Sequence, residues 1–198
     1  MPDALLAEFA AQVYPQTQGF VPGYGSLTPQ LILVGEAPGA TEVTSQRPFT
    51  GRAGVKLDLM LDALGVMREM VFITMSFHRR PIQVKANGRI GNRPPTRQEM
   101  AQEAGLLDQE LAALPQVPIL AMGTVALQRL GAGLLRDWHG QVRPVAVMAR
   151  ADAAWRPGPR RLVAACAHPA ALLYRRATEI QTLADLAAIR TVLEEIVC

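Results

Sequence analysis

Cysteine is scarce in this sequence, and long apolar runs are absent from it. Its 198 residues include two cysteines, Cys166 and Cys198, and neither has a partner at metal-ligand spacing. This scarcity excludes a disulfide framework and predicts that no metal cluster is present. No apolar run approaches the ~20 residues that a membrane-spanning helix requires, and the N-terminus lacks the basic start of a signal peptide. We therefore expect a cytoplasmic protein with no membrane partner.

A strong net charge is also absent. The chain has 20 basic and 17 acidic residues, which gives a formal net charge of +3, and 49% of its residues are hydrophobic. This composition is typical of a globular protein and excludes a disordered one. The length of 198 residues is near the usual size of one domain. We expect a single domain spanning residues 1–198 and acting as a monomer.

Short runs rich in valine, isoleucine and leucine alternate with helical patterns. The runs typical of buried parallel strands are residues 31–37, 71–77, 117–123 and 161–168. A further run at 142–148 is compatible with a short edge strand. Helices are expected over residues 51–66 and 96–114 and from near Thr178 onward. This alternation predicts an α/β fold, a three-layer α/β/α sandwich with a central four-stranded parallel sheet.

In open α/β sheets, ligands bind at the carboxyl ends of the strands, which directs attention to "GEAPGATE" after the first strand. Gly35 and Gly39 permit a close backbone approach, and Glu36 and Glu42 supply carboxylates. The carboxylates would repel a phosphate, but they suit a developing cation or a water molecule that must be oriented. The alternative is a glycine turn with solvated glutamates.

The loop after the second strand is basic. From His78 through Gln98 it contains no aspartate or glutamate, and its cations are Arg79, Arg80, Lys85, Arg89, Arg93 and Arg97. Such a run is compatible with a solvated surface. It also matches what the backbone of a polyanion would contact, and long loops in compact domains are often functional.

The stretch "HPAALLYRR" follows the fourth strand. A histidine at this place can be a structural hydrogen-bonding group or a catalyst. The residues after His168 favour a function, because Leu172 or Leu173 could enter a base stack as an apolar wedge while Arg175 and Arg176 hold flanking phosphates. Together the three segments indicate an enzyme that extracts a base from DNA.

The sequence resembles the uracil-DNA glycosylase superfamily, most closely its family-four branch. The resemblance covers roughly residues 20–196 and rests on four ordered blocks: "LILVGEAPGATE" with "RPFTGRAGVKLDLMLDALG", "VFITMSFHRRP" with "GNRPPT", "ILAMGTVALQRLGA" and "AHPAALLYRR". It implies the α/β/α fold with a four-stranded parallel sheet, DNA containing uracil or another damaged base as the partner, and hydrolysis of the N-glycosidic bond in base excision repair.

The resemblance also implies roles for individual residues. Phe49 would stack on the extruded uracil, and the backbone from Gly35 to Ala37 would line the pocket. Glu42, helped by Glu36, would place or activate water, and His168 would stabilise the negative charge on the departing base. Arg79, Arg80 and Arg93 would join Arg175 and Arg176 in contacting DNA, and the Leu172 or Leu173 side chain would fill the hole in the duplex.

Two departures from the family pattern bear on these expectations. The family-four branch holds an iron–sulfur cluster with four cysteines, whereas Arg79 stands where one of them is expected. The family's second block usually has an asparagine that reads the uracil edge, and Met75 stands there instead, although a methionine cannot supply the paired donor and acceptor. Either Ser76, His78 or the backbone reads the base, or the enzyme accepts several damaged bases.

The two lysines do not suggest a Schiff base, because Lys56 lies in a predicted helix and Lys85 in the basic loop. The sequence therefore predicts a monofunctional hydrolase without a cofactor. Two alternatives stay open. One is a catalytically inactive DNA-binding module of the same fold, which Met75 favours. The other is an α/β enzyme acting on free nucleotides, which would need phosphate-cradling loops that the sequence does not show.

Overall fold

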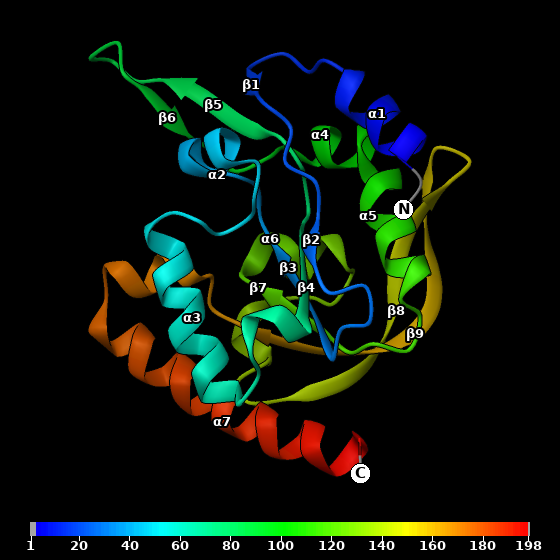
Figure 1. The fold of residues 1–198 in the computed structure, drawn as a ribbon, viewed down its shortest axis with the longest axis vertical. Helices are drawn as coiled ribbons and strands as arrows, with labels where there is room; N and C mark the ends of the chain where they lie inside the picture. The colour runs from blue at the N-terminus through cyan, green and yellow to red at the C-terminus, as the bar shows by residue number, and fades with distance from the viewer. Residues whose placement is uncertain (1–2, 198) are drawn as a thin grey trace.

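The centre of the molecule is a twisted sheet of six strands in the order β2-β4-β3-β7-β9-β8 (Figure 1). The structure is a computed structural model, and it describes residues 3–197. The strands are β2 (Tyr24–Gly25), β3 (Leu31–Gly35), β4 (Val71–Met75), β7 (Ile119–Met122), β8 (Val142–Ala151) and β9 (Ala154–Cys166). The inner strands β4, β3, β7 and β9 are parallel, as predicted. Antiparallel β2 and β8 extend the sheet at its two edges.

Helices cover both faces of the sheet. On one face, α3 (Arg52–Leu64) and α7 (Arg176–Val197) bury residues such as Leu57 and Leu186 against the sheet. On the other face lie α5 (Ala104–Ala113) and α6 (Thr124–Arg129), which contribute Leu107 and Leu127 to a second apolar cluster. Burial of these two clusters is the main force that stabilises the three layers. The predicted sandwich is confirmed.

Short elements complete the fold. They are α1 (Asp3–Ala11), α2 (Ala40–Ser45), α4 (Arg97–Gln102) and the 3-10 turns η1 (Arg68–Met70), η2 (Leu135–Asp137) and η3 (Pro169–Leu173). The predicted basic loop forms a hairpin of β5 (Arg80–Val84) and β6 (Ile90–Asn92), which pairs with β1 (Thr17–Gln18) and projects from the body of the molecule (Figure 1). Within residues 3–197 no helix is long and apolar enough to cross a membrane.

The helix predicted over residues 96–114 is divided at Glu103. The capping box that begins it is present, since the Glu99 N–H donates to Thr96 Oγ1 over 3.1 Å. Glu103 leaves the helical conformation, with φ of −100° and ψ of 7°. Its carboxylate accepts a hydrogen bond from the His78 N–H over 2.6 Å, which helps to explain why the chain bends there.

The carboxyl ends of the parallel strands meet at one edge of the sheet. Gly35 at the end of β3 pairs with Met75 at the end of β4, and Met122 at the end of β7 pairs with Cys166 at the end of β9. The segments that follow these strands are therefore brought together, although β3 ends at Gly35 and β9 ends at Cys166.

Candidate active site

A pocket of about 140 Å³ lies at this edge. The side chains and backbone around it come from five separate segments, and the lining residues are Ala37, Gly39, Glu42, Phe49, Ala53, Met75, Asn92, His168 and Ala170. The structure therefore brings Ala37, Glu42, Phe49, Met75 and His168 together, as the sequence predicted. Glu36, Gly35 and Ser76 are not among the lining residues.

Glu42 is 9% exposed and its carboxylate is held by backbone N–H groups. Oε2 accepts from Gly39 over 3.1 Å, and Oε1 accepts from Thr50 over 3.1 Å and from Gly51 over 3.0 Å. A carboxylate has about four lone-pair positions, so one position stays free to accept from a water molecule in the pocket. The alternative of a solvated glutamate does not apply to Glu42.

Glu36, Gly35 and Ser76 are adjacent in the chain to the lining residues Ala37 and Met75 but do not themselves line the pocket. Burial raises the pKa of the Glu36 carboxyl above its usual value. The Ser76 hydroxyl donates to the Gly35 carbonyl over 2.8 Å, so its proton is already used. A Cβ atom at position 35 would lie 3.0 Å from the Phe49 ring, so a larger residue there would crowd that ring.

Phe49 and His168 are neighbours in the lining of the pocket, with ring centroids 5.6 Å apart and planes inclined by 36°. His168 Nδ1 accepts a hydrogen bond from the Ala170 N–H over 3.2 Å at the start of η3. Burial lowers the pKa of His168 to about 4, although the nearby negative charge of Glu42 opposes this shift. At neutral pH the imidazole is therefore uncharged, and its proton lies on Nε2, where it can be donated.

Asn92 lines the pocket and was not identified from the sequence. Its Oδ1 accepts a hydrogen bond from Arg80 Nε over 2.7 Å, which leaves the amide Nδ2 group as a donor. A Cβ atom built on Gly39 would lie 3.3 Å from Nδ2, so the amide adjoins the first loop. No local pattern around "GNRPPT" signals this placement, because it depends on the pairing of β6 with β5.

Met75 gives the pocket an apolar side chain. Ser76 and His78, which the sequence offered as replacements for the missing amide, do not line the pocket. Met75 is 3% exposed. His78, which is 1% exposed, lies within 3.0 Å of Thr74 Oγ1 through Nε2 and within 3.4 Å of Glu110 Oε2. Neither Ser76 nor His78 can therefore read a base, whereas Asn92 offers an amide at the pocket wall.

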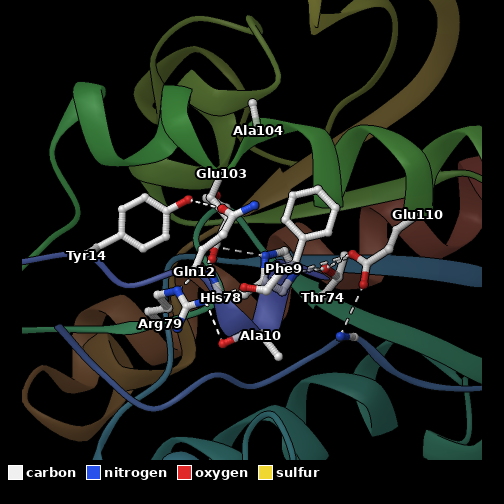
Figure 2. Close-up of polar contacts among 12 residues, drawn as sticks. Phe9, Ala10, Gln12, Tyr14, Thr74, His78, Arg79, Glu103, Ala104 and Glu110 are labelled. Carbon is white, nitrogen blue, oxygen red and sulfur yellow. Dashed lines mark hydrogen bonds and ion pairs between the residues drawn. The ribbon is translucent and has the colours of Figure 1, made fainter. Parts of the chain in front are cut away.

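The prediction that Arg79 contacts DNA is wrong, because Arg79 is buried. It is 6% exposed, and its Nε lies 3.1 Å from Glu103 Oε1. Figure 2 shows the guanidinium directed toward the carbonyl groups of Phe9 and Ala10 at the end of α1. The ring of Tyr14 also stacks against it, at 5.2 Å from its central carbon. Arg79 attaches the N-terminal helix to the sheet.

The residues in this region do not fit an iron–sulfur cluster. Arg79 occupies the place expected of one cysteine, and the cysteine count of two is below the four that such a cluster takes. Cys166 is 1% exposed within β9, and Cys198 is outside the described residues. In the part of the chain that the structure describes, no group of three or more His, Cys, Asp or Glu side chains could hold a metal ion.

The remaining cations of the basic hairpin differ in their availability. Arg93 forms two hydrogen bonds with the Glu99 carboxylate, of 2.6 and 2.8 Å, so much of its charge is compensated. Arg80 is half-buried and bonds to Asn92 and Gln18, whose side chains are uncharged. Arg175 and Arg176 are exposed where α7 begins, and they stay candidates for phosphate contacts, although Arg176 also pairs with Glu179 over 3.0 Å.

The predicted wedge at Leu172 is also corrected. Leu172 is 4% exposed and packs in the core with Leu57 and Leu186, because η3 turns its side chain inward. Leu173 is half-buried. Tyr174 follows directly and is 78% exposed. The exposed aromatic ring therefore stands beside Arg175 and Arg176, where the sequence had suggested a leucine.

Comparison with known proteins gives consistent matches. A family model, described as the uracil DNA glycosylase superfamily, matches residues 22–193. The type-4 uracil-DNA glycosylase of Archaeoglobus fulgidus is 33% identical over 156 residues, which are 79% of this chain and 73% of that protein. The type-4 uracil-DNA glycosylase of Pyrobaculum aerophilum is 38% identical over 110 residues, which are 56% of this chain and 52% of that protein.

The fold has a counterpart among solved structures. The crystal structure of wild-type SMUG2 from Pedobacter heparinus matches 98% of this chain and 97% of that chain, with a TM-score of 0.56. The two sequences are 12% identical, so the likeness concerns the fold alone.

Proposed function

Because the chain belongs to the uracil DNA glycosylase superfamily, we propose that it hydrolyses the N-glycosidic bond of uracil in DNA and leaves an abasic site for base excision repair. The observation that carries this proposal is the pocket in which Glu42, Phe49 and His168 meet at the carboxyl ends of the parallel strands. A base must leave the stack to enter it, which costs a few kcal/mol and least for damaged or mispaired bases.

The leaving base is stabilised from one side of the pocket. As the bond between C1′ and N1 breaks, its electron pair passes to the uracil ring, and the charge spreads to O2. The neutral His168 imidazole donates its Nε2 proton to that oxygen in a hydrogen bond without transferring it. Phe49 provides the surface on which the ring stacks. These contacts strengthen as charge develops, so they accelerate the reaction.

The sugar is attacked by water from the Glu42 side. The free lone pair of the carboxylate accepts a proton of the water molecule, whose oxygen forms the new bond to C1′. The water loses its proton as the bond forms, and the sugar is left with a hydroxyl group. The negative charge of Glu42 also stabilises the positive charge that develops on the sugar.

The lysines support a monofunctional reaction. Lys56 Nζ lies 2.5 Å from Glu179 Oε2, and Lys85 is exposed on the β5–β6 hairpin. Neither is among the residues that line the pocket, where an amine nucleophile would have to attack the sugar.

Asn92 is proposed to read the base in place of the amide that Met75 cannot provide. Its Nδ2–H donor suits a carbonyl oxygen of uracil and opposes the amino group of cytosine. Replacing Asn92 by alanine is expected to lower kcat/KM for uracil about fivefold, because a hydrogen bond worth about 1 kcal/mol is lost. Asn87→Ala changes the same residue type at the hairpin tip and serves as the control. An unchanged kcat/KM in Asn92→Ala would remove Asn92 from base reading.

Tyr174 is proposed to occupy the space that the extruded nucleotide leaves in a duplex. Removing the ring by Tyr174→Ala is expected to slow release from double-stranded DNA about tenfold, because stacking of a base on an aromatic ring is worth about 1–3 kcal/mol. The variant should release uracil from single-stranded DNA at the parent rate, because a single strand has no base stack in a duplex for the ring to complete. Rates of release from both substrates, measured side by side, check this. Equal losses on both substrates would contradict the wedge role.

The overall proposal is tested by measuring release of free base from oligonucleotides containing uracil, hypoxanthine, xanthine or undamaged bases. Uracil release that collapses in Phe49→Ala supports it, and added release of hypoxanthine or xanthine would show that selectivity is relaxed, as the loss of the family's asparagine at Met75 predicts. Binding of DNA without release of any base would favour the inactive DNA-binding module. We also propose that the enzyme acts as a monomer in the cytoplasm, for which light scattering and cell fractionation are the tests.

A further inference from the structure

The backbone of Phe49 has an unusual conformation. Its φ of 54° lies in the left-handed region, which a residue with a bulky side chain rarely adopts. Such strain persists only where the surrounding structure enforces it, and it is typical of functional sites. Phe49 in this conformation is 6% exposed, and its ring lines the pocket beside His168.

Arg68 holds the carbonyl side of this turn. Its Nη2 donates to the Phe49 carbonyl over 2.8 Å and to the Pro48 carbonyl over 3.2 Å. Its Nη1 lies 2.6 Å from Asp58 Oδ1 on α3, which fixes the plane of the guanidinium. A planar group with several donors can engage two carbonyls and a carboxylate at once, whereas a lysine ammonium lacks that fixed geometry.

Two other features hold the same turn. Glu42 accepts from the N–H groups of Thr50 and Gly51, which directly follow Phe49. Gly54 lies below the turn, and a Cβ atom there would approach the Phe49 carbonyl oxygen to 2.0 Å. Arg68 thus binds the carbonyl groups of the turn, and Glu42 binds the two N–H groups that follow Phe49. The lack of a side chain at Gly54 lets the turn lie close to α3.

We propose that Arg68 is a positioning residue that keeps the Phe49 ring against the extruded base. This inference rests on the proposed function, because it assigns the ring a stacking role. Arg68 belongs to η1, outside the residues that line the pocket, so it acts through Phe49 and touches no reacting atom. Because the Arg68 side chain is 35% exposed, a direct contact with DNA phosphate is the competing role that the test must separate.

The test combines Arg68→Met with Phe49→Ala in a double-mutant cycle. Arg68→Met keeps an unbranched side chain but removes the donors. It is expected to lower the single-turnover rate of uracil release about tenfold and to leave the affinity for undamaged DNA and its salt dependence unchanged. In the Phe49→Ala background the same change should have less than a twofold effect. Arg68→Lys should recover part of the rate.

The matched control is Arg190→Met, which removes another arginine paired with a carboxylate, the i, i+4 pair with Glu194 on α7. It should leave the rate unchanged. Full additivity of Arg68→Met and Phe49→Ala would overturn the proposal, and so would a loss of DNA affinity with a smaller salt slope, which would make Arg68 a phosphate contact.

A second measurement does not depend on activity. In protein labelled with fluorophenylalanine, the 19F resonance of Phe49 is identified by its absence from Phe49→Leu. Arg68→Met should shift or broaden that resonance, and Arg190→Met should not. If the parent protein releases no base, the proposed function fails while this spectrum still tests the positioning role. An unshifted Phe49 resonance in Arg68→Met would overturn it.

Discussion

Replacing His168 by alanine is expected to lower the single-turnover rate of uracil release by about 10²–10³, the usual cost of removing one donor from a developing anion. The Nε2–H group is the donor, because the Ala170 N–H already bonds to Nδ1. Affinity for undamaged DNA should be unchanged, since that affinity depends on phosphate contacts. A rate within threefold of the parent would show that another group stabilises the leaving base.

The lowered pKa of His168 also predicts how the rate and the stability depend on pH. Because burial lowers that pKa to about 4, the imidazole keeps its donor tautomer throughout the neutral range, and no change in rate should arise from its titration between pH 6 and 8. The folded pKa lies below the unfolded value of about 6.5, so the linked stability is present above pH 6.5 and is lost as the pH falls toward 4. The measurement is the free energy of unfolding by denaturant, for the parent and for His168→Ala, between pH 6.5 and pH 4. It should fall less over this range in the variant than in the parent.

Replacing Glu42 by glutamine is expected to lower the rate by about 10²–10³ through loss of the water-orienting anion, and also to destabilise the fold by about 1–3 kcal/mol. The second effect arises because the three N–H groups of Gly39, Thr50 and Gly51 converge on the carboxylate. An amide presents its own NH₂ group to at least one of them, so that donor meets donor. Single-turnover rates and urea unfolding measure the two effects separately.

Glu36→Gln is the matched control for this experiment. Glu36 supplies a carboxylate six residues earlier but is not among the residues that line the pocket, so its loss should change the rate by less than about threefold. If Glu36→Gln proved the more damaging change, the water would have to be placed by Glu36. The comparison therefore decides which glutamate serves the reaction.

The central fold and the reacting groups could be predicted from the sequence because both depend on local signals. Apolar runs mark the four parallel strands, and their carboxyl ends necessarily share one edge. Glu42 and His168 lie in the segments that follow such runs, and Phe49 was identified through the resemblance of its block to the family. Their meeting in one pocket needed only the parallel topology.

The errors came from residues whose environment is set by distant partners. Arg79 looked uncompensated because its carboxylate partner, Glu103, lies 24 residues later in the chain. Leu172 looked like the wedge because the turn η3, which directs it into the core and leaves Tyr174 exposed, has no apolar periodicity to reveal it. Asn92 was missed because a hairpin pairing places it beside Gly39.

The buried group around Arg79 has a consequence for alkaline conditions. Burial alone would lower the pKa of His78, but Glu110 and Glu103 outweigh it and raise the pKa to about 9. With Arg79 and a protonated His78 facing two glutamates, the formal charges of this group sum to zero. Above pH 9 the imidazole loses its proton, and an uncompensated negative charge is left inside the protein. The stabilisation is complete below pH 6.5 and is lost as the pH rises through 9, so alkaline conditions should weaken the attachment of α1 to the segment that follows β4.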